Sequence, residues 1–294
     1  MASNSSEPTA TVLGKRTDSI PEIAREFHFT RSDFDYLRKL VSNHTGIILS
    51  ENKYDMLYSR LVRRIRHLGL SSFAEYVELI RSGHQQEFIQ LVNAITTNLT
   101  HFFREPHHFD YLRDRVLPTA MEDRCLRIWS AGCATGEEPY SIAITLLEAL
   151  PANSDVDLRV LATDLDSHAL QTAREGVFPV ERIEGVSLAR RHRWFLRGKG
   201  GKRGDVRVKP ELQRVIQFNT LNLIQEWPIH AGFNAIFCRN VLIYFDKPTK
   251  DRIVERFANV LQPGGYLFLG HSESLIGATQ QFEAVGRTSY RRIK

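Results

Sequence analysis

The sequence predicts an α/β fold in which a mainly parallel sheet carries helices on both faces and is accompanied by a small all-helical domain. Two patterns lead to this prediction. Up to Ile95 the apolar residues recur at helical spacing, whereas after it short apolar segments alternate with helices that hold a proline in their first turn. A chain of 294 residues, 42% of them hydrophobic, can close a core for one large domain and a small companion.

The N-terminal third divides into a tail and a helical domain. Residues 1–27 are rich in Ser, Thr, Pro and Glu and lack apolar periodicity, which predicts a disordered tail. Residues 28–95 are the expected helical domain, because four short amphipathic helices follow one another there. Their apolar residues lie between Phe34 and Val41, Leu57 and Leu68, Phe73 and Ile80, and Phe88 and Ile95. A polar, hinge-like run, TTNLTHFFREPHH, leads into the second domain, residues 96–294.

The second domain alternates strands with helices. The expected strands are LRIWS, LRVLATD, VIQFN and NAIFC, and the expected helices are EPYSIAITLLEAL and KPTKDRIVERFANVL. This alternation predicts a mainly parallel sheet. The segment QPGGYLFLG predicts a turn and a further strand, beside which FEAVGRTSYRRI can pair. Residues 190–214 interrupt the alternation with a glycine-rich, strongly basic stretch, which we interpret as an inserted β-hairpin.

The composition indicates where the protein is located in the cell but says little about any reaction that it catalyses. No apolar run approaches the ~18 residues of a membrane-spanning helix, and the first twenty residues lack the apolar segment of a secretory signal, so we expect a cytoplasmic protein. The three scattered cysteines, Cys125, Cys133 and Cys238, predict buried reduced thiols. A net charge of +5 is modest and only hints at an acidic partner.

The stretch WSAGCATGEEPYSIA, residues 129–143, predicts a strand, a glycine loop and a helix start that would receive a ligand. It lacks the full dinucleotide pattern G-x-G-x-x-G. Glu137 and Glu138 would also repel a pyrophosphate, by several kcal/mol at ~4 Å and intermediate dielectric. A ligand with a ribose, positive charge and no phosphate fits better, and S-adenosylmethionine has these properties. The alternative, that the acids only stabilise the helix dipole by ~0.3–1 kcal/mol, explains one glutamate but not the glycines.

A second acid supports the same ligand. Asp164 ends the next strand, where an acid in this architecture accepts hydrogen bonds from both ribose hydroxyls. Asp166 is the rival for this role, although it is the better candidate for the cap of the helix that begins SHALQTARE.

Six motifs together resemble one family. They are NAITTNLTHFFREPHHF, WSAGCATGEEPYSIA, ATDLD, FNTLNL, FCRNVLIYFDK and PGGYLFLGHSES, and they span most of residues 30–294. In this order they resemble the CheR-type chemoreceptor glutamate methyltransferases of bacteria. The resemblance implies a Rossmann-like class I methyltransferase sheet, a small N-terminal all-α domain and an inserted antiparallel β-subdomain at residues 190–214. It also implies methyl transfer from S-adenosylmethionine to receptor glutamates, which leaves S-adenosylhomocysteine and a methyl ester.

The resemblance also implies residue roles. The expected cofactor contacts are Asn98, Thr100, Arg104, Glu137 or Glu138, Asp164, Asn222, Leu223, Asn240 and Val241. Arg104 has an independent rationale, because a guanidinium is a planar partner for the methionine carboxylate; its alternative is a surface ion pair with Glu105 or Asp110. Tyr244 resembles the aromatic residue near the transferable methyl, and its alternative is a core tyrosine. Spacing does not choose between the two glutamates.

The implied chemistry needs little more than alignment. A glutamate with a reference pKa of ~4.3 is already ionised at neutral pH, so no general base is required. We expect Arg104 and Tyr244 to be the catalytic residues, which orient the donor and help to exclude water. His101, His107, His108 and His271 show no spacing that demands a metal, so we expect none.

Two segments are candidates for receptor recognition. Arg60, Arg63 and Arg64 share one helical stripe with His67 and would bind glutamate-rich receptor helices; the alternative is an ordinary solvated face. The hairpin RGKGGKRGDVRVKPEL resembles a β-subdomain that in some members grips a C-terminal receptor pentapeptide by strand addition. A basic loop that contacts RNA is the alternative for this hairpin.

Two other functions compete with this one. A sequence pI of about 9.1 is compatible with a methyltransferase that acts on nucleic acid, but there is no Asn-Pro-Pro-aromatic run for a flipped base and no stacking platform for single strands. A receptor-docking adaptor without catalysis would not need Arg104, Asp164 and Asn240. We therefore expect no nucleic-acid partner, no membrane insertion and a monomeric chain.

Overall fold

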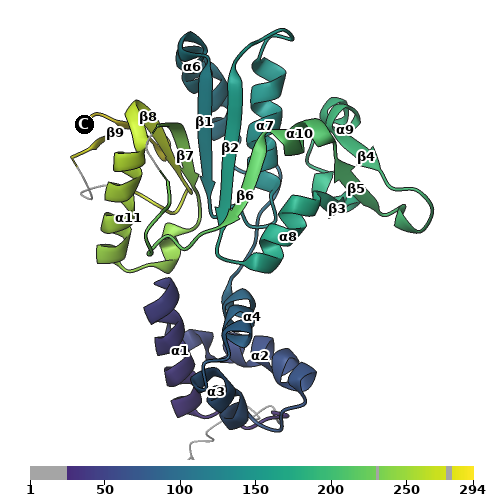
Figure 1. The fold of residues 1–294 in the computed structure, drawn as a ribbon, viewed down its shortest axis with the longest axis vertical. Coiled ribbons are helices and arrows are strands. Elements are labelled where there is room, and N and C mark those ends of the chain that lie inside the picture. The colour runs from purple at the N-terminus through teal and green to yellow at the C-terminus, as the bar shows by residue number, and fades with distance from the viewer. Residues whose placement is uncertain (1–24, 230–231, 276–279) are drawn as a thin grey trace, which may run out of the picture.

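A computed structural model describes residues 25–229, 232–275 and 280–294. The helical domain, drawn in purple, lies at one end of the α/β domain (Figure 1). Most of the expected tail, residues 1–24, lies outside the described residues. The last residues of that expected tail already contact the helical domain, since Arg25 forms an ion pair with Asp55 at 2.5 Å.

The four predicted helices of the N-terminal domain are α1 (Arg31–Thr45), α2 (Tyr54–Leu68), α3 (Phe73–Arg81) and α4 (Gln85–Ile95), with a short 3₁₀ turn at Glu51–Lys53. Thr30 and Asp33 form a capping box that begins α1, and Gly46 ends it with a φ of 74°. The periodic apolar side chains meet in one core, where Phe34, Leu61 and Phe73 are fully buried.

A seven-stranded sheet forms the second domain, in the order β6-β2-β1-β7-β8-β10-β9. Its strands are β1 (Cys125–Ala131), β2 (Asp157–Asp164), β6 (Ile216–Thr220), β7 (Phe233–Cys238), β8 (Leu261–Leu269), β9 (Phe282–Gly286) and β10 (Ser289–Arg292). The first five in spatial order are parallel, and β10 runs antiparallel to both β8 and β9. This arrangement confirms the predicted fold class, including the terminal segment that pairs beside β8.

Strand β1 shows why both faces carry helices. Leu126 and Ile128 belong to a core that also contains side chains of α7 (Glu137–Ala149). Trp129 and Ala131 belong to a second core on α11 (Lys247–Val260). Successive side chains of a strand point to opposite faces, so a strand with buried apolar side chains on both faces must be covered on both sides.

A small antiparallel sheet projects from the α/β domain (Figure 1). It contains β3 (Val177–Pro179), β4 (Phe195–Arg197) and β5 (Asp205–Val208), with β5 in the middle. The predicted hairpin corresponds to β4 and β5. Strand β3 was not predicted from the sequence and lies outside residues 190–214; its Phe178 pairs with Val206, and both side chains are buried.

The remaining helical elements connect these layers. They are α5 (His107–Tyr111), a π-helical turn (Leu112–Val116), α6 (Leu117–Asp123), α8 (Ser167–Glu175), α9 (Leu188–Trp194), α10 (Pro210–Arg214) and 3₁₀ turns at Val180–Ile183, Gly200–Lys202 and Leu242–Tyr244. Among the described residues, no helix combines the length and apolarity needed to cross a membrane.

Candidate functional site

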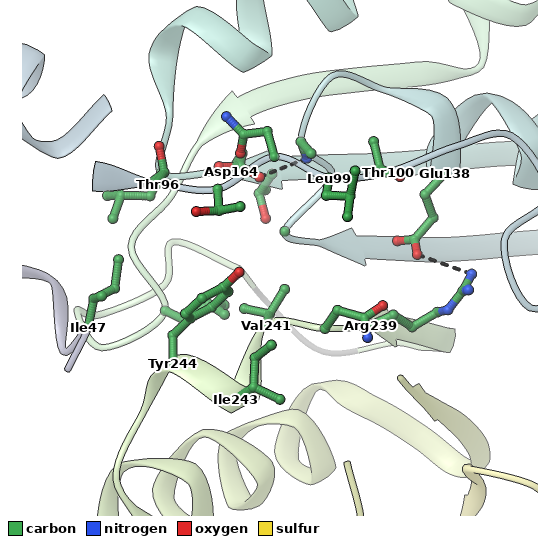
Figure 2. Close-up of a pocket in the computed structure, with 18 of the residues that line it drawn as sticks. Ile47, Thr96, Leu99, Thr100, Glu138, Asp164, Arg239, Val241, Ile243 and Tyr244 are labelled. Carbon is green, nitrogen blue, oxygen red and sulfur yellow. Dashed lines mark hydrogen bonds and ion pairs between the residues drawn. The ribbon is translucent and has the colours of Figure 1, made fainter. Parts of the chain in front are cut away.

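A cavity of about 350 Å³ opens where the helical domain meets the carboxyl ends of the parallel strands (Figure 2). Ile47 and Ile95 line it from the helical domain, and Thr163 and Asp164 line it from the end of β2. Two further walls come from segments that follow strands of the seven-stranded sheet: residues 221–223 follow β6, and residues 239–241 and 243–245 follow β7. Parallel α/β sheets bind ligands at this edge, so the cavity is where the fold predicts a site.

The cavity brings most of the predicted residues together. Its lining includes Asn98, Thr100, Arg104, Glu138, Asp164, Asn222, Leu223, Asn240, Val241 and Tyr244. Glu137 is absent from this lining. Residues from five separate stretches of the chain thus line one cavity, and each stretch belongs to one of the motifs described above.

The two adjacent glutamates have different surroundings. Glu138 lines the cavity, where the Ser130 hydroxyl donates to its Oε1 at 2.7 Å. Glu137 is fully buried and accepts a hydrogen bond of 2.6 Å from the Thr135 hydroxyl, with Arg182 at 3.5 Å. Glu138 is therefore the candidate for ligand contact. Glu137 instead contacts Thr135 of the glycine loop and Arg182.

Asp164 and Asp166 also separate. The Asp164 carboxylate lines the cavity and accepts backbone hydrogen bonds from Ala134 at 2.8 Å and Asp166 at 2.9 Å. Burial raises the pKa of Asp164 to about 6. Asp166 caps α8 by accepting from the backbone of His168 and Ala169. Asp166 thus performs the capping role that the sequence favoured for it.

Close packing explains the glycines of the loop. Gly132 has a φ of 97°, and a Cβ there would lie 2.3 Å from Val241 Cγ2. Gly136 has a φ of 100°, and its Cβ would lie 2.8 Å from Ala173 Cβ. Larger residues would push the loop away from the segment after β7 and from α8, so the backbone geometry and the space both require glycine.

Arg104 and Tyr244 both line the cavity. Arg104 donates to the Leu99 carbonyl at 3.0 Å, and among the described residues it forms no ion pair with Glu105 or Asp110. Tyr244 projects into the cavity rather than into the core (Figure 2). Burial raises its pKa, and the positive charge of Arg104 opposes that rise.

Arg239 is a site residue that the sequence analysis missed. Its side chain is only 2% exposed and lies 3.4 Å from Glu138 Oε2 and 3.6 Å from Glu105 Oε2. It also donates to the Arg104 carbonyl. A buried guanidinium needs acidic partners, and these come from distant parts of the chain. Burial raises the pKa of Glu138, while Arg239 opposes this rise. The motif FCRNV contains Arg239, but the resemblance implies roles only for its last two residues, Asn240 and Val241.

Glu273 was also missed. It is 6% exposed and accepts three backbone hydrogen bonds, from Asn240 at 2.8 Å, Ile243 at 3.2 Å and Gly270 at 2.7 Å. Asn240 has a φ of 59°, which is rare for a residue with a side chain. Glu273 therefore holds the strained segment that carries Asn240 and Tyr244. Its partners are backbone groups, so no sequence motif reveals the contact.

The basic stripe on α2 is largely used inside the protein. Arg60 donates to the carbonyls of Ala94, Ile95 and Thr96 at 3.1, 2.8 and 2.8 Å, and so caps the end of α4. Arg64 forms a bidentate pair with the buried Glu87 at 3.0 and 2.6 Å. Arg63 is exposed and remains a candidate for contact with an acidic partner.

One cluster has the residue types of a metal site. Ligand atoms of Glu105, His107 and His108 lie within 4.8 Å of one another. However, the Arg239 guanidinium lies 3.6 Å from Glu105 Oε2 and would repel a cation. Burial, with further contributions from Arg239 and His107, lowers the pKa of His108 to about 3. The cluster is therefore poorly suited to a metal, and the expectation of metal-free chemistry stays a prediction.

The residues present fit S-adenosylmethionine. The volume suits a small ligand, and the carboxylates of Asp164 and Glu138 favour a cation that carries hydroxyl groups. In addition, Asn240 lines the cavity, and its Oδ1 is buried without a hydrogen-bond partner among the described residues. A buried acceptor of this kind is costly unless a ligand satisfies it.

Comparison with known proteins agrees with this fit. Residues 32–96 match the family model "CheR methyltransferase, all-alpha domain", and residues 98–291 match "CheR methyltransferase, SAM binding domain". Chemotaxis protein methyltransferase 2 of Pseudomonas aeruginosa is 48% identical over 269 residues, which cover 90% of this chain and 95% of that protein. The chemotaxis protein methyltransferase of Escherichia coli is 40% identical, with 96% of this chain and 98% of that protein covered. The chain therefore belongs to the CheR methyltransferase family, whose cofactor is S-adenosylmethionine.

Proposed function

We propose that this methyltransferase converts glutamate side chains of bacterial chemoreceptors into methyl esters in the cytoplasm. The observation that carries the proposal is a single cavity with an acidic wall, Asp164 and Glu138, and a cationic and phenolic mouth, Arg104 and Tyr244. The acidic wall suits the cationic methyl donor, and the mouth suits an incoming carboxylate. The relatives' names, which place them in chemotaxis, support the receptor as the acceptor.

In this proposal the chain's own residues hold the donor at several points. Asp164 accepts from the ribose hydroxyls, and Asn240 offers its unpartnered Oδ1 to the ammonium group. Arg104 binds the methionine carboxylate. Asn222 and Leu223 line the adenine end. The donor, when bound, supplies an electrophilic methyl group on a positively charged sulfur.

The protein's remaining task is alignment and exclusion of water. The acceptor carboxylate is ionised at neutral pH, so no residue has to remove a proton. Arg104 and Tyr244 orient the reacting groups at the mouth, while Val241 and Ile243 provide apolar wall beside them. Opposite charges cancel as the methyl moves to oxygen, and a poorly hydrated site favours that change.

The decisive experiment compares acceptors. The enzyme is incubated with methyl-labelled S-adenosylmethionine and either receptor-containing membranes or total RNA, and the products are then treated with alkali. We expect label in the receptor and its release as methanol, because only esters hydrolyse in this way. Label in RNA, or alkali-stable label in protein, would overturn the proposal in favour of a nucleic-acid methyltransferase or another acceptor atom. Binding without turnover would identify an adaptor.

We also propose two docking sites for the receptor and a monomeric enzyme. Strand β4 lies at an edge of the small sheet, where an extended C-terminal receptor peptide can add as a further strand.

On α2, the exposed Arg63 can attract an acidic receptor helix. Calorimetric titration with a receptor C-terminal pentapeptide tests the first site, and the salt dependence of receptor methylation in an Arg63→Ala variant tests the second.

A further inference from the structure

Large aliphatic side chains gather in solvent at the mouth of the cavity. Leu99 is 77% exposed and Ile243 is 46% exposed, and both line the cavity. Ile48 is 48% exposed and follows Ile47, which also lines it. These three residues, which we call the aliphatic rim, come from three separate segments of the chain. Grouped exposed apolar side chains beside a site usually mark a surface for a partner.

The aliphatic rim is connected to the proposed catalytic residues. The Leu99 carbonyl accepts from Arg104 at 3.0 Å, and the Ile48 backbone N–H donates to the Tyr244 carbonyl at 2.9 Å. Ile243 immediately precedes Tyr244. In Figure 2, Leu99 lies on the opposite wall of the cavity from Ile243 and Tyr244. Aliphatic side chains of the rim therefore stand on both walls of the cavity that contains Tyr244.

The charges near Tyr244 indicate which chemical group would enter the mouth of the cavity. Within the described parts of the chain, neither Arg60 nor Arg104 has an acidic partner, since the hydrogen bonds of both guanidinium groups go to carbonyl or hydroxyl oxygens. Both positive charges act on the Tyr244 hydroxyl and oppose the rise of its pKa. In the proposed function Arg104 binds the donor's carboxylate, which leaves Arg60 as the positive charge that acts on Tyr244 without an acidic partner. The mouth thus combines positive charge with an apolar border, which is complementary to a carboxylate flanked by apolar groups.

We infer that the aliphatic rim binds apolar side chains that lie one helical turn from the acceptor glutamate on a receptor helix, and thereby selects which glutamates are methylated. This inference rests on the proposed function. Residues three or four positions apart share one face of a helix, so a glutamate that enters the mouth brings those neighbours onto the rim. Charged neighbours would lose water against Leu99 and Ile243 without gaining a partner, and such glutamates would be poor substrates.

The test uses Leu99→Ser and Ile243→Ser, with Ile293→Ser as the matched control. Ile293 is also an exposed aliphatic residue, at 51%, but it does not line the cavity. For a helical cytoplasmic receptor fragment we expect KM to rise about tenfold in each rim variant, as expected for the loss of a partly buried aliphatic contact. The Kd for S-adenosylhomocysteine should stay within about twofold of the wild-type value, and the control should change neither constant.

A second experiment makes the substitutions on the receptor instead of on the enzyme. Replacing the apolar residues one turn from the acceptor glutamate by serine should raise the KM of the wild-type enzyme similarly, and should add little further loss to Leu99→Ser. Unchanged receptor KM in both rim variants, or an equal loss of S-adenosylhomocysteine affinity, would overturn the inference. If the wild-type enzyme esterifies no receptor, the proposed function fails instead. Calorimetric binding of the fragment in the presence of S-adenosylhomocysteine then tests the rim by itself.

Discussion

Neighbouring acids at the start of α7 take different roles because their side chains leave the helix in different directions. Glu138 faces the cavity and Arg239, whereas Glu137 is enclosed by Thr135 and Arg182. Local sequence cannot distinguish them, since both stand in the first turn with the same charge. The side-chain environment, and not the residue type, makes Glu138 the candidate for ligand contact.

This difference predicts unequal effects of two matched substitutions. Glu138→Gln removes a negative charge from the cavity wall and should weaken binding of S-adenosylmethionine by roughly tenfold or more, since hydrogen bonds to charged groups are worth ~1.5–3 kcal/mol. Glu137→Gln, in the same turn, should change the affinity much less. Calorimetric titration of the two variants measures the difference. Equal losses would contradict the assignment.

Asp164 predicts a pH dependence of cofactor binding. Burial raises the pKa of its carboxyl to about 6 in the free protein, so the group binds a proton as the pH falls through that value. In its proposed role, the ionised carboxylate of Asp164 accepts hydrogen bonds from the ribose hydroxyls, so binding below the pKa requires release of the proton. Affinity should therefore be constant above the pKa and fall by up to about tenfold per pH unit below it.

Titrations of S-adenosylhomocysteine between pH 5 and pH 8, a range of about 3 units around this pKa, test that expectation. Asp164→Asn should bind more weakly at high pH and show a flatter profile. Glu138 also titrates in the cavity, and burial raises its pKa as well, so Glu138→Gln serves as the comparison. A wild-type profile that does not change with pH would contradict the role of Asp164.

At the scale of elements, two walls of the cavity depend on unusual backbone conformations that neighbouring side chains require or stabilise. The glycine loop depends on Gly132 and Gly136 because Val241 and Ala173 leave no room for a Cβ. The segment after β7 depends on Glu273, whose carboxylate collects backbone N–H groups from two separate segments of the chain. A carboxylate in such a backbone nest stabilises a conformation that its own residues disfavour.

Glu273→Gln should therefore impair the site although Glu273 does not line the cavity. The amide would turn donor groups toward backbone N–H groups, which costs roughly 1–3 kcal/mol for a buried unsatisfied contact. We expect weaker S-adenosylhomocysteine binding and a lower kcat, measured by calorimetry and by receptor methylation. Glu283→Gln, which removes an exposed partner of Arg291 on β9, is the control and should leave both near the wild-type values.

At the scale of the whole molecule, the linker of residues 96–101 forms a wall of the cavity and is held by several parts of the protein. Arg60 of α2 binds its first carbonyl, and Arg182, which follows β3, donates to the Thr100 carbonyl at 3.0 Å. Asp166 accepts from Asn98 at 2.7 Å and from the Thr96 hydroxyl at 2.6 Å. The helical domain and the α/β domain, including the turn that follows β3, thus fix one wall of the site.

Asp166→Ala tests whether this anchoring matters. The variant loses a helix cap, worth about 1 kcal/mol, together with both linker contacts. Asp246→Ala is a matched control, because Asp246 caps α11 through Thr249 at 2.9 Å without contacting the linker. Both variants should lower Tm, but only Asp166→Ala should also weaken S-adenosylmethionine binding. Equal affinities in the two variants would mean that the linker needs no such anchor.

The sequence by itself determined the four N-terminal helices, the strands of the seven-stranded sheet, the order of the domains and the ligand class of the glycine loop. These features follow from local periods and spacings, such as the apolar repeat of α2 or the acid that ends β2. Only the tertiary structure decided that Glu138 rather than Glu137 faces the cavity, that Arg60 and Arg64 have partners inside the protein, and that Arg239 and Glu273 belong to the site. Each of these depends on a contact between segments far apart in the chain or on the direction of one side chain, and no local period encodes either.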